Sequence, residues 1–242
     1  KKEYSKRHHS GYLGQKSKKE MKIFCIGYNK SGTTSLYYTI KELGFNADDR
    51  TMDAGEKLMY NVHEGDLKAV TDWVGKEDSV ELFKDVPFSI PQVWKSIYEK
   101  YPNAKYILSE RDTPDQWYNS IKKFHQVGFG LSENPTWEEI SNIGYRYIRN
   151  DGAGGFMYDY MKYTYGKEFP PYDKDNLIRS YNSHNNEIKE FFKDKDNFIS
   201  VKVSQNNDYI KLCNFLNKEP IRDKFLKLKV TKELEQIRIN KK

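Results

Sequence analysis

The stretch KIFCIGYNKSGTTSL, residues 22–36, decides the fold of this chain. It begins with an apolar run typical of a buried strand and ends in residues that open a helix. Between the two, Gly27 and Gly32 have the G-x-x-x-x-G spacing of a phosphate-binding loop. The backbone amides from about Lys30 to Thr34 would then converge on an anion at the start of the helix. The stretch therefore predicts a phosphate-type ligand between a strand and a helix.

The loop lacks the lysine that a nucleoside triphosphate requires. Such loops place G-K-[ST] at the second glycine, so that the lysine reaches the β- and γ-phosphates and the hydroxyl binds Mg²⁺. Here Gly32 is followed by Thr33 and Thr34, and Lys30 precedes the second glycine. A P-loop nucleotide or small-molecule kinase is therefore only the alternative enzyme class.

Short apolar runs alternate with longer periodic patterns along the chain. The runs at 22–28, 79–86, 105–111 and 197–203 are typical of strands. The patterns at 34–43, 89–101, 114–127, 136–150, 174–192 and 206–217 indicate helices. Strands separated by helices favour a parallel sheet. We expect an α/β fold of three layers, α/β/α, with a mostly parallel central sheet and the topology of P-loop NTPases.

Two helix starts carry local signals. SIPQ at 89–92 is a capping-box pattern with Ser89 as N-cap, and Thr113 precedes a proline at the first helical position. Residues 150–172, rich in glycine and tyrosine, predict a loop-and-helix insertion at the periphery of the sheet. Its tyrosines either line an acceptor pocket or pack in the core; they are Tyr158, Tyr160, Tyr163 and Tyr165.

Charge and composition argue against two classes of protein, those that bind nucleic acid and those that span a membrane. Of the 41 Lys and Arg, seven lie in residues 1–20, against two of the 35 acidic residues, so the other 222 residues carry 34 basic and 33 acidic side chains. A nearly neutral body argues against a nucleic-acid partner. We interpret 1–20 as a basic, solvated extension and 21–242 as a single domain. No apolar run approaches the length of a membrane span. The two cysteines provide no disulfide or metal framework, which favours a reducing, cytoplasmic setting.

NKSGTTS, residues 29–35, resembles the 5′-phosphosulfate loop of the sulfotransferases. That family uses 3′-phosphoadenosine 5′-phosphosulfate (PAPS) and shares the P-loop topology without the Walker lysine or a metal. The resemblance implies that Lys30 interacts with the bridging oxygen and the leaving phosphate. It also implies a set of residues around the 5′-phosphosulfate, namely Lys30, Ser31, Gly32, Thr33, Thr34 and Ser35.

KYILSERDTPDQWYNSI, residues 105–121, resembles the family's 3′-phosphate motif, which implies that Arg111 and Ser120 bind the 3′-phosphate. The family interval from arginine to serine is eight residues, whereas here it is nine. The extra residue falls in the turn before the helix. Residues 207–220 resemble the terminal helix of one branch of the family. A further basic C-terminal segment of many members is missing, and Arg222, Lys227 or Lys229 are its possible substitutes.

The resemblance also indicates where the general base would lie. In relatives the base follows the second strand, near a lysine, and ELFKDVPF places Lys84 and Asp85 there. The alternative interpretation of Asp85 is an ordinary turn carboxylate. Histidines are the rival bases, because an imidazole is matched to neutral pH. They are His63, His125 and His184, of which His125, on the helix of Ser120, is the strongest candidate.

These patterns together predict a sulfotransferase. It would move a sulfuryl group from PAPS, without a metal, to a hydroxyl or an amine of a small-molecule acceptor. Two alternatives stay open: the P-loop kinase, and a catalytically inactive nucleotide-binding module that has kept the loop.

Nucleotide preference tests this prediction. In calorimetric titration, wild type is expected to bind 3′,5′-ADP tightly without metal, and Arg111→Ala is expected to lose that binding, because the guanidinium would hold the 3′-phosphate. ADP with Mg²⁺ is the comparison ligand. A preference for ADP with Mg²⁺ would identify an unusual kinase instead.

Overall fold

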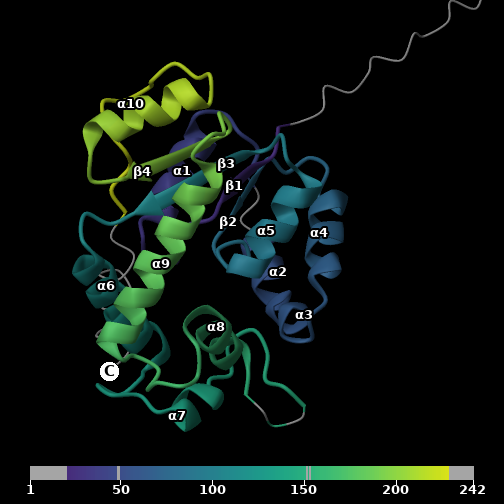
Figure 1. Cartoon of the computed structure of the whole chain (residues 1–242), viewed down its shortest axis with the longest axis vertical. Coiled ribbons are helices and arrows are strands. Elements are labelled where there is room, and N and C mark those ends of the chain that lie inside the picture. Colours follow the sequence, from purple (N-terminus) through teal and green to yellow (C-terminus); the bar gives the residue numbers. More distant parts are fainter. Residues whose placement is uncertain (1–20, 48–49, 151, 153, 229–242) are drawn as a thin grey trace, which may run out of the picture.

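The computed structural model describes residues 21–47, 50–150, 152 and 154–228, so the predicted extension at 1–20 lies outside them (Figure 1). Its centre is a sheet in the order β2-β1-β3-β4, in which every pair of neighbours is parallel. The strands are β1 (Ile23–Cys25), β2 (Leu82–Lys84), β3 (Lys105–Glu110) and β4 (Phe198–Lys202). Each lies within its predicted run, and the prediction of a parallel α/β sheet is confirmed.

Helices surround this sheet. In chain order they are α1 (Thr33–Glu42), α2 (Arg50–Lys57), α3 (Met59–His63), α4 (Leu67–Lys76), α5 (Pro91–Lys100), α6 (Pro114–Phe129), α7 (Trp137–Ser141), α8 (Phe156–Tyr165), α9 (Lys174–Phe192) and α10 (Asn206–Phe215). Five of them, α1, α5, α6, α9 and α10, match predicted patterns to within two residues at each end. The insertion at 150–172 contains a helix, α8, as predicted.

Three sequence expectations about the helices were wrong or incomplete. The helix predicted at 136–150 ends at Ser141, because the chain then turns through a left-handed residue, Arg146 (φ 63°). Ser89 is not an N-cap: the cap is Ile90, and Ser89 is buried before it. The helix starts at Pro91 because proline needs no hydrogen-bond acceptor there. Finally, α2, α3 and α4, of eight, five and ten residues, were not predicted.

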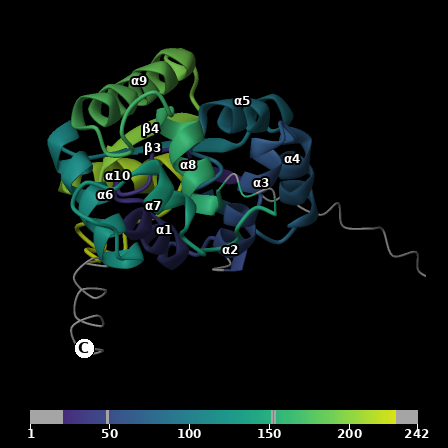
Figure 2. The ribbon, with the colours of Figure 1, turned by 90° about the horizontal axis from the view of Figure 1, so that it is seen from below.

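Alternating residues of the strands divide the core into two layers. Ile23 and Cys25 face one side of the sheet, where they pack against α1 and α10. Phe24 and Ile26 face the other side, where they pack against α5 and α9. Figure 2 shows α5 and α9 on one side of the strands and α1 on the other. These are the three layers that the sequence predicted.

The core layer that contains Phe24 and Ile26 continues past the carboxyl ends of the strands. It takes in the buried Trp117 and Ile121 of α6 and Phe156 and Met161 of α8. Figure 1 accordingly shows α7 and α8 beyond that end of the sheet. This is where parallel α/β sheets bind ligands. No helix of the described part of the chain is long and apolar enough to cross a membrane.

Close packing at Gly27 holds the end of β1 against β3. A Cβ atom at Gly27 would lie 2.6 Å from the carbonyl oxygen and 2.7 Å from Oγ of Ser109. Both distances are too short for real contacts, and the carbonyl belongs to backbone that cannot rotate away. The chain therefore requires glycine at this position.

A pair of glycine substitutions tests this packing. Gly27→Ala is expected to lower the free energy of unfolding by about 1–3 kcal/mol, because a methyl group there overpacks the core. Gly128→Ala is the matched control: Gly128 lies inside α6 with nothing within 4 Å of its added Cβ, so alanine should stabilise by up to about 1 kcal/mol. Urea denaturation measures both. Equal stability of Gly27→Ala and wild type would contradict the packing.

Candidate functional site

The loop between β1 and α1 is held in place from its inner side. The buried hydroxyl of Ser31 donates to the carbonyl oxygen of Tyr28 at 2.6 Å and accepts from Ser109 Oγ at 2.6 Å. The backbone amide of Ser31 also donates to that carbonyl. Trp117 Nε1 donates to the carbonyl oxygen of Asn29 at 2.9 Å. Ser31 thus supports the loop from behind, and this geometry does not favour its predicted contact with a ligand.

The first backbone amides of α1 have no hydrogen-bond partner within the helix and are available to an anion. Its N-cap, Gly32, provides no side-chain cap, and the first turn contains no acidic residue. Gly32 has φ 109°, and a Cβ there would lie 2.6 Å from Val203, so the position requires glycine. The first amides of a helix lack intrahelical partners and carry its positive dipole end. Thr33, Thr34 and Ser35 follow in the predicted cradle.

The two residues of the predicted 3′-phosphate motif come together beside this loop. Arg111 Nε donates to the carbonyl oxygen of Lys30 at 2.7 Å, and its Nη2 lies 3.5 Å from Ser120 Oγ. The backbone amide of Arg111 donates to the hydroxyl of Tyr181. The extra residue in the turn therefore does not separate the pair. Burial lowers the pKa of Arg111 from its ordinary value.

The C-terminal segment runs along α1 toward the same cradle. The backbone amide of Leu226 donates to Thr39 Oγ1, and that of Leu228 donates to Ser35 Oγ at 3.4 Å. Arg222 is engaged elsewhere, in a two-pronged ion pair with Glu42. Of the three possible basic substitutes, Lys227 thus lies in the segment nearest the start of α1, while Lys229 lies outside the described residues.

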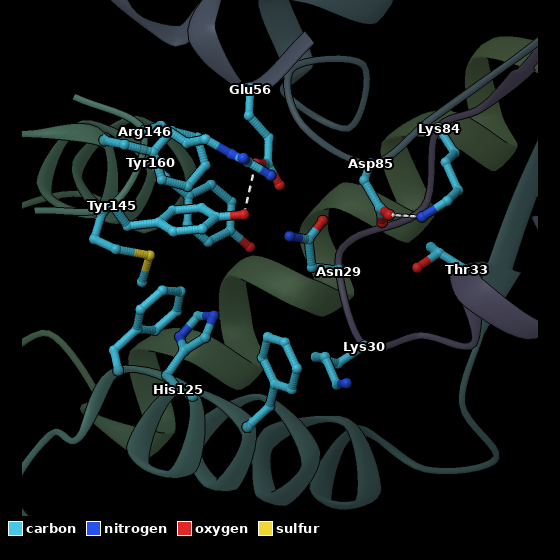
Figure 3. Close-up of a pocket in the computed structure, with 15 residues that line it drawn as sticks. Asn29, Lys30, Thr33, Glu56, Lys84, Asp85, His125, Tyr145, Arg146 and Tyr160 are labelled. Atoms are coloured by element: carbon cyan, nitrogen blue, oxygen red, sulfur yellow. Dashed lines mark hydrogen bonds and ion pairs between the residues drawn. The ribbon is translucent and has the colours of Figure 1, made fainter. Parts of the chain in front are cut away.

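A pocket of about 420 Å³ opens next to the loop (Figure 3). One end is polar and is formed by Asn29, Lys30, Thr33, Lys84 and Asp85. The walls are mainly aromatic and are formed by Phe124, Phe129, Tyr145, Phe156 and Tyr160. Segments that are far apart in sequence thus meet here: the loop, the end of β2, helix α6, the turn that carries Tyr145, and helix α8.

Lys84 and Asp85 both face this pocket although they are neighbours in sequence. Adjacent residues of a strand point to opposite faces, but Asp85 has φ 59°, which turns its side chain back toward Lys84. The Lys84 ammonium and Asp85 Oδ2 form an ion pair. Asp85 Oδ1 is buried and has no hydrogen-bond partner among the described residues. Asp85 therefore has one carboxylate oxygen that is paired with a cation and one that has no partner among the described residues.

Lys30 sits in the pocket in an apolar environment. Its ammonium lies 3.8 Å from the centre of the Phe124 ring. Burial lowers the pKa of Lys30 to about 8; the negative charge of Asp85 raises it in part, and the positive charges of Arg111 and Lys84 lower it further. The lysine is therefore only partly charged in weakly alkaline solution, until an anion binds beside it.

The three candidate histidines have different surroundings. His125 lines the pocket, but its Nδ1 is 2.7 Å from the hydroxyl of Tyr172, and burial together with the charge of Lys30 lowers its pKa to about 3. His184 is a core residue that stacks on Tyr28, and its Nε2 contacts a backbone carbonyl. His63 lies between α3 and α8, where it contacts the hydroxyl of Tyr163. Of the three, His125 alone lines this pocket.

Sequence reasoning missed three polar residues of the pocket. Glu56 of α2 accepts hydrogen bonds from the hydroxyl of Tyr145, at 2.9 Å, and from Arg146 Nε. Burial raises the pKa of Glu56, although Arg146 opposes the shift. Asn29 supplies a buried side-chain oxygen. The loop motif already contained Asn29, but no local signal placed Glu56 or Arg146, because both reach the pocket through turns and a helix that the sequence did not predict.

Comparison with known families agrees with this geometry. Residues 22–233 match the sequence model of the sulfotransferase domain. The chain belongs to the sulfotransferase family. It is therefore a PAPS-dependent transferase with the P-loop sulfotransferase fold, and both predictions are confirmed. A search of curated proteins found no match. Within 21–228, apart from the undescribed positions, no three His, Cys, Asp or Glu side chains cluster as metal ligands do.

The lowered pKa of Lys30 leads to a pH prediction for this sulfotransferase. Above roughly pH 8 the free lysine is largely neutral, and a bound anion favours its charged form. Binding of 3′,5′-ADP at roughly pH 9 should therefore take up most of a proton, and binding at roughly pH 6 should take up little. Calorimetry in buffers of different ionisation enthalpy measures the uptake. In Lys30→Arg, whose guanidinium stays charged, the uptake at high pH should vanish. Unchanged uptake in this variant would show that Lys30 is not the titrating group.

Proposed function

We propose that this sulfotransferase moves a sulfuryl group from PAPS to a hydroxyl of a small-molecule acceptor, with Asp85 as the general base. One observation carries the proposal. Asp85, whose buried Oδ1 has no hydrogen-bond partner among the described residues, lines the same pocket as Lys30 and Thr33 at the start of α1. A proton acceptor and the residues that attract an anion thus converge on one space, as a transfer reaction requires.

The residues present fit PAPS. The uncapped start of α1 and Lys30 suit the 5′-phosphosulfate, since both favour an anion. Arg111 and Ser120, which lie 3.5 Å apart, suit the 3′-phosphate. When bound, PAPS supplies the sulfuryl group, whose bond to the bridging oxygen breaks as sulfur bonds to the acceptor oxygen and 3′,5′-ADP leaves.

Side chains of the pocket would accept the proton of the acceptor hydroxyl and stabilise the charge on the leaving phosphate. Asp85 Oδ1 takes the proton of the acceptor hydroxyl, which makes its carboxyl neutral. Lys84 loses its paired negative charge in the same step, so its ammonium acts more strongly on the anion in the pocket. Lys30 neutralises the charge that develops on the leaving phosphate. Proton removal and charge stabilisation are therefore coupled through the Lys84–Asp85 pair.

His125 is the weaker candidate for the base. Its Nδ1 already contacts the hydroxyl of Tyr172, and a proton on the ring would create a buried cation near Lys30. We therefore propose that His125 shapes the pocket wall. An amine acceptor is the less favoured variant, because an amine that is protonated at neutral pH would have to lose a proton before it could attack.

The size of the pocket supports a small acceptor. Its volume of about 420 Å³ falls in the range of about 300–1,000 Å³ that is typical of small-molecule sites. We also propose a cytoplasmic setting, which is supported by Cys25 and Cys213: both are buried and neither forms a disulfide. The nearly balanced charge outside residues 1–20 supports the absence of a nucleic-acid partner.

Paired substitutions test the assignment of the base. Asp85→Asn keeps the shape of the side chain and tolerates the left-handed backbone. It should lower kcat by about 10²–10⁴-fold and leave 3′,5′-ADP binding intact. His125→Asn should lower kcat by less than about tenfold, since it removes no proton acceptor of the reaction. Transfer from radiolabelled PAPS to a panel of phenols and alcohols provides the assay, and thermal melting checks folding. The reverse order of effects would assign the base to His125.

A further inference from the structure

Two consecutive carbonyl groups of the loop after β1 bond to side chains outside the loop. The carbonyl oxygen of Asn29 accepts from Trp117 Nε1 at 2.9 Å, and that of Lys30 accepts from Arg111 Nε at 2.7 Å. A carbonyl oxygen carries partial negative charge, so one that turned toward a bound anion would repel it. The two donors therefore help to keep this part of the loop in a shape that suits an anion.

Trp117, of α6, and Tyr181, of α9, form one stacked pair next to this loop. Their rings are nearly parallel, 14° apart in plane, with 4.5 Å between centres. Tyr28, which precedes Asn29, packs against both rings, at 6.0 Å and 6.4 Å between centres. Helices α6 and α9 pack against each other (Figure 1), and Trp117 and Tyr181 are 0% and 2% exposed. A buried, stacked pair of this kind restrains the position of both rings.

Each member of the pair bonds to the backbone of one proposed phosphate motif. Trp117 donates to the loop carbonyl of Asn29, whereas the hydroxyl of Tyr181 accepts from the backbone amide of Arg111 at 2.9 Å. Arg111 Nη2 lies 3.5 Å from Ser120 Oγ, where we place the 3′-phosphate. Because Trp117 and Tyr181 are buried, they would influence a nucleotide through the backbone to which they bond and not by touching it.

We propose that Trp117 and Tyr181 are positioning residues for the nucleotide: Trp117 sets the loop at the 5′-phosphate, and Tyr181 sets Arg111 at the 3′-phosphate. This inference rests on the proposed function. Donors that are fixed before the ligand arrives bind it more tightly, because ordering them on binding costs free energy. Trp117 thus strengthens the binding of any nucleotide with a 5′-phosphate, whereas Tyr181 strengthens the selection of a nucleotide that also has a 3′-phosphate.

Two nucleotides separate these roles. 3′,5′-ADP and 5′-AMP share the adenosine and the 5′-phosphate, but only 3′,5′-ADP has the 3′-phosphate. Calorimetric titration measures both dissociation constants, and weak binding of 5′-AMP is measured by its competition with 3′,5′-ADP. The ratio of the two Kd values reports the selection of the 3′-phosphate, and a partial loss of folded protein does not change it. Wild type should prefer 3′,5′-ADP by at least about tenfold.

The variant Tyr181→Phe tests the contact with the 3′-phosphate motif. It keeps the stacked ring and removes the hydroxyl that accepts from the amide of Arg111. The preference for 3′,5′-ADP over 5′-AMP should fall by about three- to tenfold, while Kd for 5′-AMP should stay within about twofold of wild type. Tyr106→Phe is the matched control, because it loses a hydroxyl that donates to the backbone carbonyl of Tyr101 at 2.9 Å, near the start of β3. This control should keep the wild-type ratio.

The variant Trp117→Phe tests the contact with the loop. It removes the indole donor, so both nucleotides should bind about three- to tenfold more weakly and their ratio should stay unchanged. Trp137→Phe is the control, because Trp137 Nε1 also donates to a backbone carbonyl, that of Phe169, at 2.9 Å. The calorimetric stoichiometry counts the protein that is competent to bind. If Trp117→Phe does not fold, Trp117→β-(3-benzothienyl)alanine keeps the bicyclic ring and replaces only the N–H group by sulfur.

Several outcomes would overturn the inference. They are an unchanged ratio in Tyr181→Phe, wild-type affinity for both nucleotides in the variant of Trp117 that folds, and equal losses in the control variants. If wild type selects 3′,5′-ADP and both test variants behave like wild type, the inference fails and the proposed function stands. If wild type binds neither nucleotide, or does not distinguish them, the proposed PAPS site fails, and this inference fails with it.

Discussion

The whole site depends on one buried contact, the hydrogen bond of 2.6 Å between the hydroxyls of Ser31 and Ser109. It ties the loop after β1 to the end of β3, where Gly27 allows the two backbones to approach closely. The loop then turns through left-handed conformations at Lys30 and Gly32 and starts α1 with its amides exposed to an anion. Arg111 lies just beyond β3 and donates to the carbonyl oxygen of Lys30 at 2.7 Å, so the residues of the two proposed phosphate sites lie side by side.

Two residues of the pocket lining, Asp85 and Arg146, have left-handed backbone conformations. In a regular strand or helix their side chains would point in other directions. Asp85 turns back toward Lys84 in this way, and Arg146 reaches Glu56 across the pocket. Non-glycine residues at positive φ are uncommon and are often found at functional sites. The strain at these positions is compatible with folding because the surrounding core of aromatic rings is well packed and holds the turns in place.

The two motifs of the proposed nucleotide site were visible in the sequence, whereas most residues of the proposed acceptor pocket were not. The loop and the Arg111–Ser120 motif are each contained in a short stretch, and the spacing of their residues is set by one turn between a strand and a helix. Glu56 and Arg146, in contrast, are 90 positions apart and meet through a salt bridge. The helix predicted at 136–150 ends at Ser141, and the turn that follows carries Tyr145 and Arg146 to the pocket.

The sequence by itself therefore determined the parallel α/β fold, the loop that we propose to bind an anion, and the family, since these depend on local periodicity and on spacing within single turns. Only the tertiary structure decided which side chains line the proposed acceptor pocket. It placed His63 and His184 away from the pocket and brought Asp85 and Asn29 into its lining. The physical reason is that a pocket is formed by side chains from distant segments, whose convergence depends on the packing of the whole core.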